Sequence, residues 1–421
     1  MAFLFDLAAA PDYPSSHTFA GTYATRALVA TEGYDAGSAS FSVVDISAFG
    51  TGAQKYFGGV LTTNFKIVFA PWNANNVGIF DPATSAFSVV DISATITIGS
   101  KYHGGVLAPS GKVVFVPATA DSVGVFDPAT GDFMVVDISA FGAGIPWKYH
   151  GGVLAQNGNI YFVPHTADNV GIFNPATSAF SVIDISGTIS FNNKYHGGVL
   201  APNSIIYFVP AMANNVGIFD PATNVFSVVD ISAFGTGPYK YLGGVLAPSG
   251  KIICVPFDGS NVGIFDPTTN AFSVIGISAT VSIDTYKYAG GVLAKNGKVV
   301  FAPRNAPKVG VFDPSTNEFS VVDIPTFVGT GERWGGRHAG GVLGKNGKVV
   351  FVPYDSDSVE VFDLGSSTLA YNVSGGLPQA SALSREKRPP SERVKGPPSM
   401  GLSMGWLAIS SLLLRMQALC L

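Results

Sequence analysis

Short apolar runs dominate the chain and are separated by polar or turn-forming residues. One stretch shows the pattern clearly, with four runs of five or six residues that begin at His103, Lys112, Val123 and Phe133. Runs of this length, rich in Val, Ile and Phe, predict β-strands. The second run is apolar on both faces, which is typical of an inner strand packed between neighbouring sheets. The fourth places Asp137 among hydrophobic residues, as an outer strand can.

The same four runs recur along most of the chain, and the first run of each unit contains the tetrad Gly-Gly-Val-Leu. The seven copies start at Gly58, Gly104, Gly151, Gly197, Gly243, Gly290 and Gly340. Successive copies are 46 or 47 residues apart, except for a last step of 50. A period of about 40 to 50 residues is typical of propeller blades or other stacked units, because one unit cannot bury its own apolar faces. We therefore expect an all-β fold, a seven-bladed β-propeller of four-stranded blades of about 46 residues each.

The two ends of the repeat region predict a closed ring. Phe41–Ile46 matches the fourth run of a unit but has no first three runs before it. The last unit, Gly340–Asp363, has the first three runs and only a degenerate Leu369–Val373 after them. An N-terminal strand can therefore complete the last blade, which removes exposed sheet edges. The expected organisation is a lead-in at 1–40, the propeller at 41–375, a linker at 376–404 and a short apolar segment at 405–421.

Turn-forming residues recur at two places in each unit. The link between the first and second runs carries a glycine that supplies the positive φ of a tight hairpin. It occurs at Gly111, Gly158, Gly250, Gly297 and Gly347, and units one and four lack it. The link between the third and fourth runs begins with Asp-Pro, or with Asn-Pro at Asn174. Because the proline presets φ and the Asp or Asn side chain accepts a backbone N–H, we expect these repeated acids to be structural.

Composition narrows the classes of function. Charged residues make up 12% of the chain and the net charge is −4. An acidic chain with few cations argues against a nucleic-acid or anionic-membrane partner. The two cysteines, Cys254 and Cys420, form no disulfide framework. The N-terminus lacks a cationic region before its apolar stretch, which makes it a poor secretory signal. These features favour a cytoplasmic protein, and we expect a monomer without a cofactor.

The C-terminal region breaks with the repeat. Ser381–Ser399 is rich in Ser, Pro, Arg and Lys, a composition typical of disorder. Trp406–Leu421 is apolar, but it has 16 residues and includes Arg415 and Gln417. It is therefore short for the roughly 20 residues that span a bilayer. A C-terminal membrane anchor, an amphipathic helix for a partner and a wrong gene end are the alternatives that this segment leaves open.

Two segments of the second unit resemble the kelch-type propeller repeat and, less closely, the YVTN repeat. They are Gly111–Val116 and Val123–Phe133, and the likeness extends over roughly residues 41–373. The repeat departs from the kelch pattern because Val-Pro replaces its double glycine and Phe133 replaces its tryptophan. No Trp-Asp or Gly-His signature of WD repeats occurs. The resemblance implies a partner-binding scaffold more often than an enzyme, although a fold alone assigns no function.

A cation and then an aromatic residue or histidine precede each glycine pair. The cations are Lys55, Lys101, Lys148, Lys194, Lys240, Lys287 and Arg337, and the following residues are Tyr56, Tyr102, Tyr149, Tyr195, Tyr241, Tyr288 and His338. In a propeller these positions lie where loops gather around the central channel, so a ring of cations could bind a small anion or an acidic protein segment. Alternatively, each lysine lies along its tyrosine and offsets nearby acids such as Asp121, Asp168 and Asp357. The sequence favours the second interpretation and leaves the first as the candidate binding site.

Three histidines follow these tyrosines in adjacent units, at His103, His150 and His196. Three imidazoles on neighbouring blades could point at one metal ion. Zinc requires N–Zn distances of about 2.0–2.1 Å, however, and we expect equivalent atoms of neighbouring blades to be too far apart. We therefore predict no metal site and regard these histidines as weak candidates, with packed or solvated side chains as the default.

Residues that occur in only one unit concentrate in the longest link between units, Thr326–Ala339. This link contains Glu332, Arg333, Trp334, Arg337 and His338, and other loops contain Trp72, Trp147 and Arg304. Because Trp and Arg are the commonest anchors of binding hot spots, we expect the contact with a ligand or partner on this side. Glu332 and His338 could form an acid–base pair, but no nucleophile elbow, phosphate loop or metal-spacing motif accompanies them.

The sequence thus predicts a non-catalytic interaction or ligand-binding scaffold whose loops on one propeller face recognise a protein partner or a small anion. One alternative is a propeller enzyme, such as a hydrolase, lyase or sugar-acting enzyme, with a single site on the same face. The other is a purely structural repeat protein.

Overall fold

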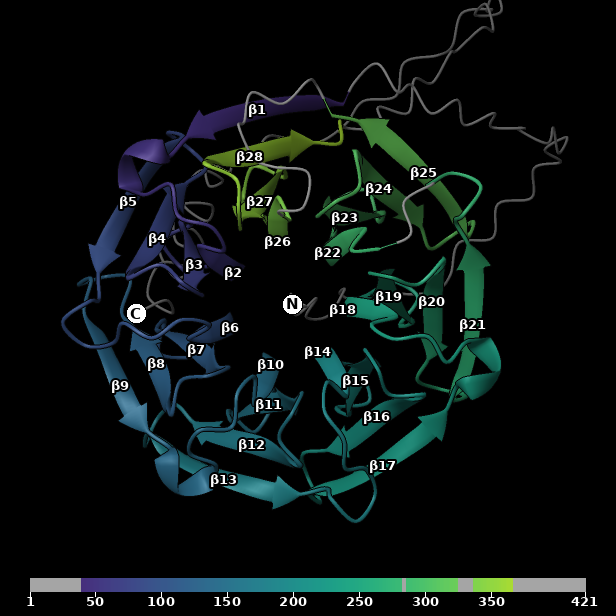
Figure 1. The fold of residues 1–421 in the computed structure, drawn as a ribbon. Coiled ribbons are helices and arrows are strands. Elements are labelled where there is room, and N and C mark those ends of the chain that lie inside the picture. The colour runs from purple at the N-terminus through teal and green to yellow at the C-terminus, as the bar shows by residue number, and fades with distance from the viewer. Residues whose placement is uncertain (1–38, 282–284, 325–335, 366–421) are drawn as a thin grey trace, which may run out of the picture. The chain divides into compact units, whose positions relative to one another are not determined.

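The computed structural model of the chain describes residues 39–281, 285–324 and 336–365. Within these ranges, seven four-stranded antiparallel sheets are arranged in a ring (Figure 1). This arrangement confirms the predicted seven-bladed β-propeller. The linker and the C-terminal segment, almost all of the lead-in, the degenerate run Leu369–Val373 and the link residues Glu332, Arg333 and Trp334 lie outside the described residues. Among the described residues, no helix is long and apolar enough to cross a bilayer.

The strands of each blade follow one another from the centre of the ring to its rim. The innermost strands, which form the hub, are β2 (Tyr56–Leu61), β6 (Tyr102–Leu107), β10 (Tyr149–Leu154), β14 (Tyr195–Leu200), β18 (Tyr241–Leu246), β22 (Tyr288–Leu293) and β26 (His338–Leu343). The second strands are β3 (Ile67–Pro71), β7 (Val113–Pro117), β11 (Ile160–Pro164), β15 (Ile206–Pro210), β19 (Ile252–Pro256), β23 (Val299–Pro303) and β27 (Val349–Pro353).

The outer half of each blade has the same regularity. The third strands are β4 (Asn76–Asp81), β8 (Ser122–Phe126), β12 (Asn169–Asn174), β16 (Asn215–Asp220), β20 (Asn261–Asp266), β24 (Lys308–Asp313) and β28 (Ser358–Asp363). The rim strands are β5 (Ala86–Asp91), β9 (Phe133–Asp137), β13 (Ala179–Asp184), β17 (Val225–Asp230), β21 (Ala271–Gly276), β25 (Glu318–Asp323) and β1 (Ser40–Asp45). Three short 3₁₀ helices, η2 (Ser47–Phe49), η3 (Ser139–Phe141) and η4 (Ser232–Phe234), follow rim strands.

The N-terminal strand closes the ring, as predicted. β1 pairs with β28 antiparallel over six residues, from Ser40 opposite Asp363 to Asp45 opposite Ser358. The ring of Phe41 packs against Phe362 with centroids 4.7 Å apart. The last blade therefore combines one strand from the beginning of the propeller with three from its end, so the two ends of the ring are tied together by a sheet.

The apolar core lies between the blades. The second strand is fully buried in every blade, as expected for an inner strand. Each core cluster is shared by neighbours; in one of them, Val163 of the third blade packs with Phe208 of the fourth. Rim strands alternate between half-buried and exposed residues. Because each blade completes the core of the next, stability depends on the intact ring.

The turns have the chemistry that the repeat predicted. Gly111 and the equivalent glycines have φ between 80° and 84°, and in units one and four Phe65 and Ser204 take up the same left-handed conformation. In the second blade the Asp127 carboxylate accepts a hydrogen bond from the N–H of Ala129 at 2.9 Å. In the third blade the Asn174 side chain accepts the equivalent bond at 2.9 Å. These side chains hold the turns, which confirms their structural role.

The first glycine of each pair brings neighbouring blades together at the hub. These residues, Gly58, Gly104, Gly151, Gly197, Gly243, Gly290 and Gly340, have φ between 77° and 111°, and we call them the glycine collar. A Cβ atom added to Gly197 would lie 3.1 Å from the Cα of Gly243, and one added to Gly151 would lie 3.2 Å from the Cα of Gly197. Only glycine permits this approach, so hub residues of adjacent blades lie closer than larger side chains would allow.

Candidate functional site

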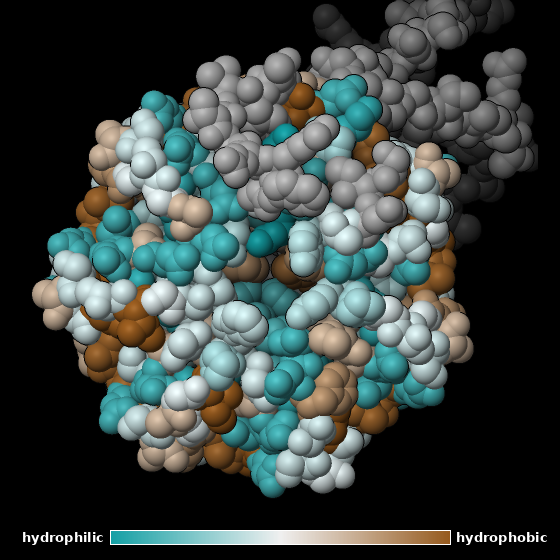
Figure 2. Space-filling model, in the orientation of Figure 1, coloured by the Kyte–Doolittle hydropathy of each residue, from teal (hydrophilic) through white to brown (hydrophobic). Residues whose placement is uncertain are grey.

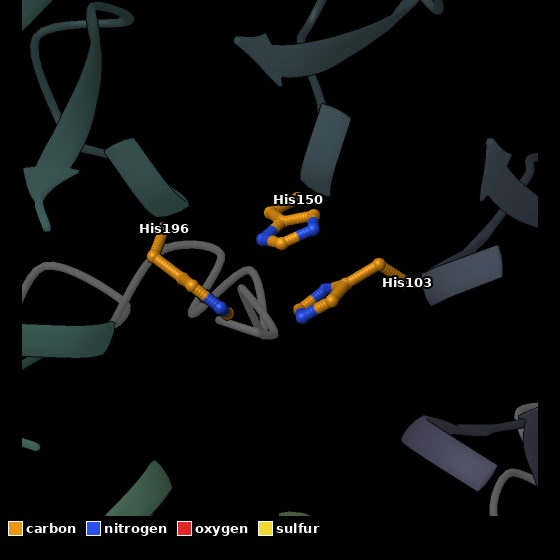
Figure 3. A group of neighbouring side chains, drawn as sticks. All are labelled: His103, His150 and His196. Carbon is orange, nitrogen blue, oxygen red and sulfur yellow. The ribbon is translucent and has the colours of Figure 1, made fainter. Parts of the chain in front are cut away.

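Three histidines converge at the hub. His103, His150 and His196 are the second residues of β6, β10 and β14, each directly before the glycine collar, and only 5 to 7% of their surface is exposed. The rings of His103 and His150 stack with centroids 4.0 Å apart, and that of His196 lies 4.5 and 4.6 Å from them. One ring nitrogen of each lies within 4.8 Å of the other two, and the rings point toward one another (Figure 3). Because the collar draws the hub strands together, these nitrogen atoms gather at one point, and the expectation that no metal binds there stays a prediction.

The imidazoles of His103 and His150 are left without hydrogen-bond partners. Neither ring nitrogen of either residue has one among the described residues. Burial lowers the pKa of His103, His150 and His196 well below the usual histidine value, so all three rings are neutral at pH 7. A neutral imidazole has one donor and one acceptor nitrogen, and buried groups of this kind are normally paired. The hub therefore contains buried donor and acceptor atoms that no described residue pairs with.

These histidines line a cavity of about 70 Å³ at the centre of the ring. Its walls are the glycine pairs and the second residue of each hub strand. We call the latter the first hub layer: Phe57, His103, His150, His196, Leu242, Ala289 and Ala339. A water molecule needs roughly 10–15 Å³ of such space, so the cavity can hold a few waters or one small group. The propeller face in Figure 2 is hollowed near its centre, and hydrophilic residues border the hollow.

A second hub layer is formed by the residue after each inner-strand proline: Trp72, Ala118, His165, Ala211, Phe257, Arg304 and Tyr354. It stacks directly on the first layer, since the ring of His165 lies 3.6 Å from His150 and that of Trp72 lies 5.8 Å from His103. Nδ1 of His165 is held by the carbonyl of Tyr195 at 2.8 Å. The buried Nε1 of Trp72 has no hydrogen-bond partner among the described residues. It is a third unused polar group beside the cavity.

Arg304 places a positive charge over the hub. Its guanidinium carbon lies 4.3 Å from the ring centre of Tyr354, 5.8 Å from that of Phe257 and 5.9 Å from that of Phe57. Arg304 also contributes, after burial, to the low pKa of His103. Its field therefore reaches the histidines, although the residue belongs to a different blade. In the sequence, Arg304 is a singleton, a residue that occurs in only one unit, but the sequence could not show that its side chain lies across the hub.

The six lysines of the predicted cation ring are buried in the loops and do not face the hub cavity. The six lysines are 0 to 6% exposed, and neither they nor Arg337 line the hub cavity. Three of them form ion pairs with the acids named above: Lys55 with Asp357 at 2.8 Å, Lys148 with Asp121 at 2.7 Å and Lys194 with Asp168 at 2.7 Å. These ion pairs agree with the interpretation in which the lysines offset nearby acids instead of binding a ligand.

Lysines of this ring also donate to oxygen atoms of the loops. Nζ of Lys101 donates to the carbonyls of Asn73 and Ala74 at 3.2 and 3.0 Å. Nζ of Lys240 donates to Oδ1 of Asn214 and to the carbonyl of Gly237, both at 3.1 Å. Burial lowers the pKa of Lys101 and of Lys240 to about 8. These ammonium groups hold neighbouring loops together.

The candidate tyrosines pack inside the blades. The hydroxyls of Tyr149 and Tyr195 donate to Oδ1 of Asn169 and Asn215, each at 2.5 Å. Burial raises the pKa of Tyr102 to about 12. All three rings belong to core clusters between blades. Each therefore contributes to packing, with its hydroxyl directed away from the hub cavity.

In the last blade, the tyrosine is replaced by His338, which is fully buried. Its Nδ1 lies 2.8 Å from the carbonyl oxygen of Pro303, and its Nε2 lies 3.2 Å from Oε2 of Glu360, without hydrogen-bond geometry. Glu360 is 1% exposed and stands where the other six blades have glycine. The sequence analysis missed this residue, although its signal was that single departure from the repeat. Arg337 is half-buried, and burial lowers its pKa.

No family model matches the chain, and no curated protein matches it either. Among solved structures, it is similar to a streptogramin B lyase, with 17% identity, 77% of this chain and 98% of the other covered, and a TM-score of 0.61. The virginiamycin B lyase from Staphylococcus aureus is 13% identical, with 77% and 99% covered and a TM-score of 0.60. The WD40 propeller domain of Doa1 is 10% identical, with 74% and 94% covered and a TM-score of 0.54. These likenesses support a β-propeller fold, and the kelch-type resemblance stays a prediction.

Proposed function

We propose that the protein is a non-catalytic binding scaffold that takes a small carboxylate ligand at its hub. The observation that carries the proposal is the divergence of the blades at the two hub layers. The hub strands repeat Gly-Gly-Val-Leu without change, whereas the residue just before this tetrad is Phe, His, Leu or Ala. The second layer varies still more, from alanine to tryptophan and arginine. Identical blades would produce a symmetric hub, and these differences produce one asymmetric surface.

The chemistry of this surface suits an anion. Arg304 supplies the positive charge, and Trp72 supplies an N–H without a partner. His103 and His150 supply further ring nitrogens, and none of the described residues that line the cavity is a carboxylate. Hydrogen bonds to a charged acceptor are the stronger kind, particularly from a guanidinium. A carboxylate offers the negative charge and the acceptor oxygens that suit these donors.

The surroundings favour binding over a conformational change. The hub residues stand on strands that are fixed by pairing and by buried cores on both sides. A preformed site requires little ordering on binding. Phe257 and Tyr354 place apolar rings beside the guanidinium, which would pack against the carbon atoms of a ligand. A protein partner, as the kelch-type resemblance implies, could use the same site through an acidic side chain or a C-terminal carboxylate.

The test is ligand-induced stabilisation of the full chain by acetate, succinate and citrate, measured as a shift in melting temperature. A ligand at 100 times its Kd stabilises the folded state by about 2.7 kcal/mol. We expect at least one of the three to stabilise the protein in a salt-sensitive way. Arg304→Met should abolish the shift, and Lys308→Met should retain it, because Lys308 forms an exposed ion pair with Asp323 at the start of β24. No shift, or an equal shift in both variants, would refute the proposal.

A second candidate is an enzyme that uses the same hub. It is favoured by the buried histidines with unpartnered nitrogens, since histidine is the commonest general base. The solved virginiamycin B lyases include a catalytically inactive histidine-to-alanine variant with quinupristin bound. Turnover of quinupristin that is lost in His103→Phe would favour this candidate. Ligand binding without turnover would favour the scaffold.

A further inference from the structure

We propose that His103, His150 and His196 together bind one transition-metal ion, such as Zn²⁺, in the hub cavity. This inference goes beyond the proposed function, because such an ion needs only these three side chains and no organic ligand. Among the His, Cys, Asp and Glu side chains of the described residues, these three histidines form the group whose possible ligand atoms all lie within 4.8 Å of one another.

The geometry is close to that of a metal site. Zinc–nitrogen distances of about 2.0–2.1 Å imply nitrogen–nitrogen distances of about 3.3 Å in a tetrahedral site. Donors that lie up to 4.8 Å apart must therefore approach by up to about 1.5 Å. Each imidazole can do so by rotating about two side-chain bonds into the adjacent cavity. His196 already lies at 72° and 62° to the other two rings. The rings of His103 and His150 are 14° from parallel, so one of them must tilt to direct its lone pair at the ion.

The unpartnered nitrogens indicate that the cluster lacks a ligand. His103 and His150 are more than nine-tenths buried, and none of their four ring nitrogens has a hydrogen-bond partner within the described ranges. A buried polar group without a partner destabilises the folded state. A metal ion would engage one nitrogen of each ring, which turns this cost into binding energy. A cluster kept only for packing could use Phe, Leu or Ala, as the other four blades do.

The donors also select the class of metal. Imidazole nitrogen suits Zn²⁺, Cu²⁺, Ni²⁺ and Co²⁺, whereas Mg²⁺ and Ca²⁺ prefer oxygen ligands. Three protein ligands leave the fourth position of a tetrahedral ion open toward the cavity, for a water or a carboxylate. His165 does not complete the site through Nδ1, because that atom is held by the Tyr195 carbonyl at 2.8 Å. The positive charge of Arg304 disfavours a cation nearby, and an anionic fourth ligand would offset it.

The experiment is a calorimetric titration of the full chain with ZnCl₂ and CoCl₂ after removal of metals with a chelator. We expect one ion per chain and, for Co²⁺, the visible absorption of a tetrahedral site. The variants His103→Phe and His196→Leu place at each site the residue found at Phe57 or Leu242, so the hub should tolerate them. Each should weaken binding by more than about tenfold, since loss of even an outer-shell partner costs 10–100-fold. His17→Ala, which removes a histidine outside the described residues, should leave the affinity unchanged.

The result that would overturn the proposal is the absence of binding, or binding that His103→Phe and His196→Leu leave unchanged while both variants keep the melting temperature of the metal-free protein. The failure of this proposal is distinguishable from that of the carboxylate site. Arg304→Met should abolish stabilisation by carboxylates but strengthen Zn²⁺ binding, because it removes a nearby positive charge. A chain that binds Zn²⁺ and no carboxylate would refute only the proposed function, and the reverse would refute only the metal site.

Discussion

The glycine collar makes a sharp prediction about stability, because the cost of adding one methyl group can be separated into two parts. Gly197 has φ of +86°, and its added Cβ would lie 3.1 Å from the Cα of Gly243. Gly158 has φ of +80°, but nothing lies within 4 Å of its added Cβ. Gly158→Ala therefore measures the cost of the left-handed backbone alone, about 1–2 kcal/mol. Gly197→Ala adds a contact with backbone atoms of the next blade.

The second part of the cost follows from what the methyl group meets. A flexible side chain would move aside, but the Cα of Gly243 can move only with its blade. Overpacking of this kind costs about 1–3 kcal/mol. We therefore expect Gly197→Ala to destabilise the protein by about 2–5 kcal/mol in total, and Gly158→Ala by no more than about 2 kcal/mol.

Urea unfolding followed by circular dichroism measures both free energies of unfolding. The m-value must be the same in both variants and the wild type for the comparison to hold. Equal destabilisation by Gly197→Ala and Gly158→Ala would refute the reasoning, because it would show that the blades have room at the collar. A larger effect of Gly158→Ala would refute it more strongly.

Three further predictions test other parts of the ring. Deleting residues 1–47 removes β1 and should lower the melting temperature of the whole propeller, whereas deleting residues 1–38 should not; equal melting temperatures would contradict ring closure. His338→Tyr and Glu360→Gly should each destabilise the protein, but together they restore the tyrosine–glycine pair of the other blades. A double-mutant cycle should therefore give a coupling free energy of about 2 kcal/mol, and additive effects would contradict the contact between the two residues. The folded-state pKa of Lys101 is about 8, below that of the unfolded chain, so the unfolded state binds more protons between pH 8 and 10. In this range the free energy of unfolding of the wild type should rise relative to that of Lys101→Met by up to about 1.4 kcal/mol per pH unit. A constant difference between the two proteins in urea titrations would contradict the shift.

The strands, turns and ring closure were predictable because their causes are local and repeated. Because the same apolar runs recur in seven copies, comparing the copies fixes where each strand begins and ends. Gly111 and Asp127 determine their turns through their own backbone and side chain. Ring closure could be predicted by matching the two ends of the repeat. Phe41–Ile46 was a fourth strand without a blade, and the last unit was a blade without a fourth strand.

The hub was not predictable, because it depends on distances between blades. The sequence shows that His103, His150 and His196 occupy equivalent positions, but not that the collar brings their ring nitrogens within 4.8 Å. It shows that Arg304 is a singleton, but not that its guanidinium lies over rings of three other blades. The pairing of Glu360 with His338 joins residues on two strands of one blade, and only their shared departure from the repeat could have revealed it.

Repetition itself helps to separate structural from functional residues in such a ring. A residue that recurs in most blades tends to meet its partner within the repeat, so its charge or polarity is satisfied there, as for Lys148 with Asp121 and Lys194 with Asp168. A residue that occurs once has no such partner prepared for it. Some of these residues lie beside each other, as the buried His338 does with its Nε2 3.2 Å from Oε2 of Glu360. Singletons that stay unpartnered although buried, such as Trp72 beside the hub histidines, keep binding capacity that nothing in the repeat uses, and a ligand is the simplest way to satisfy it.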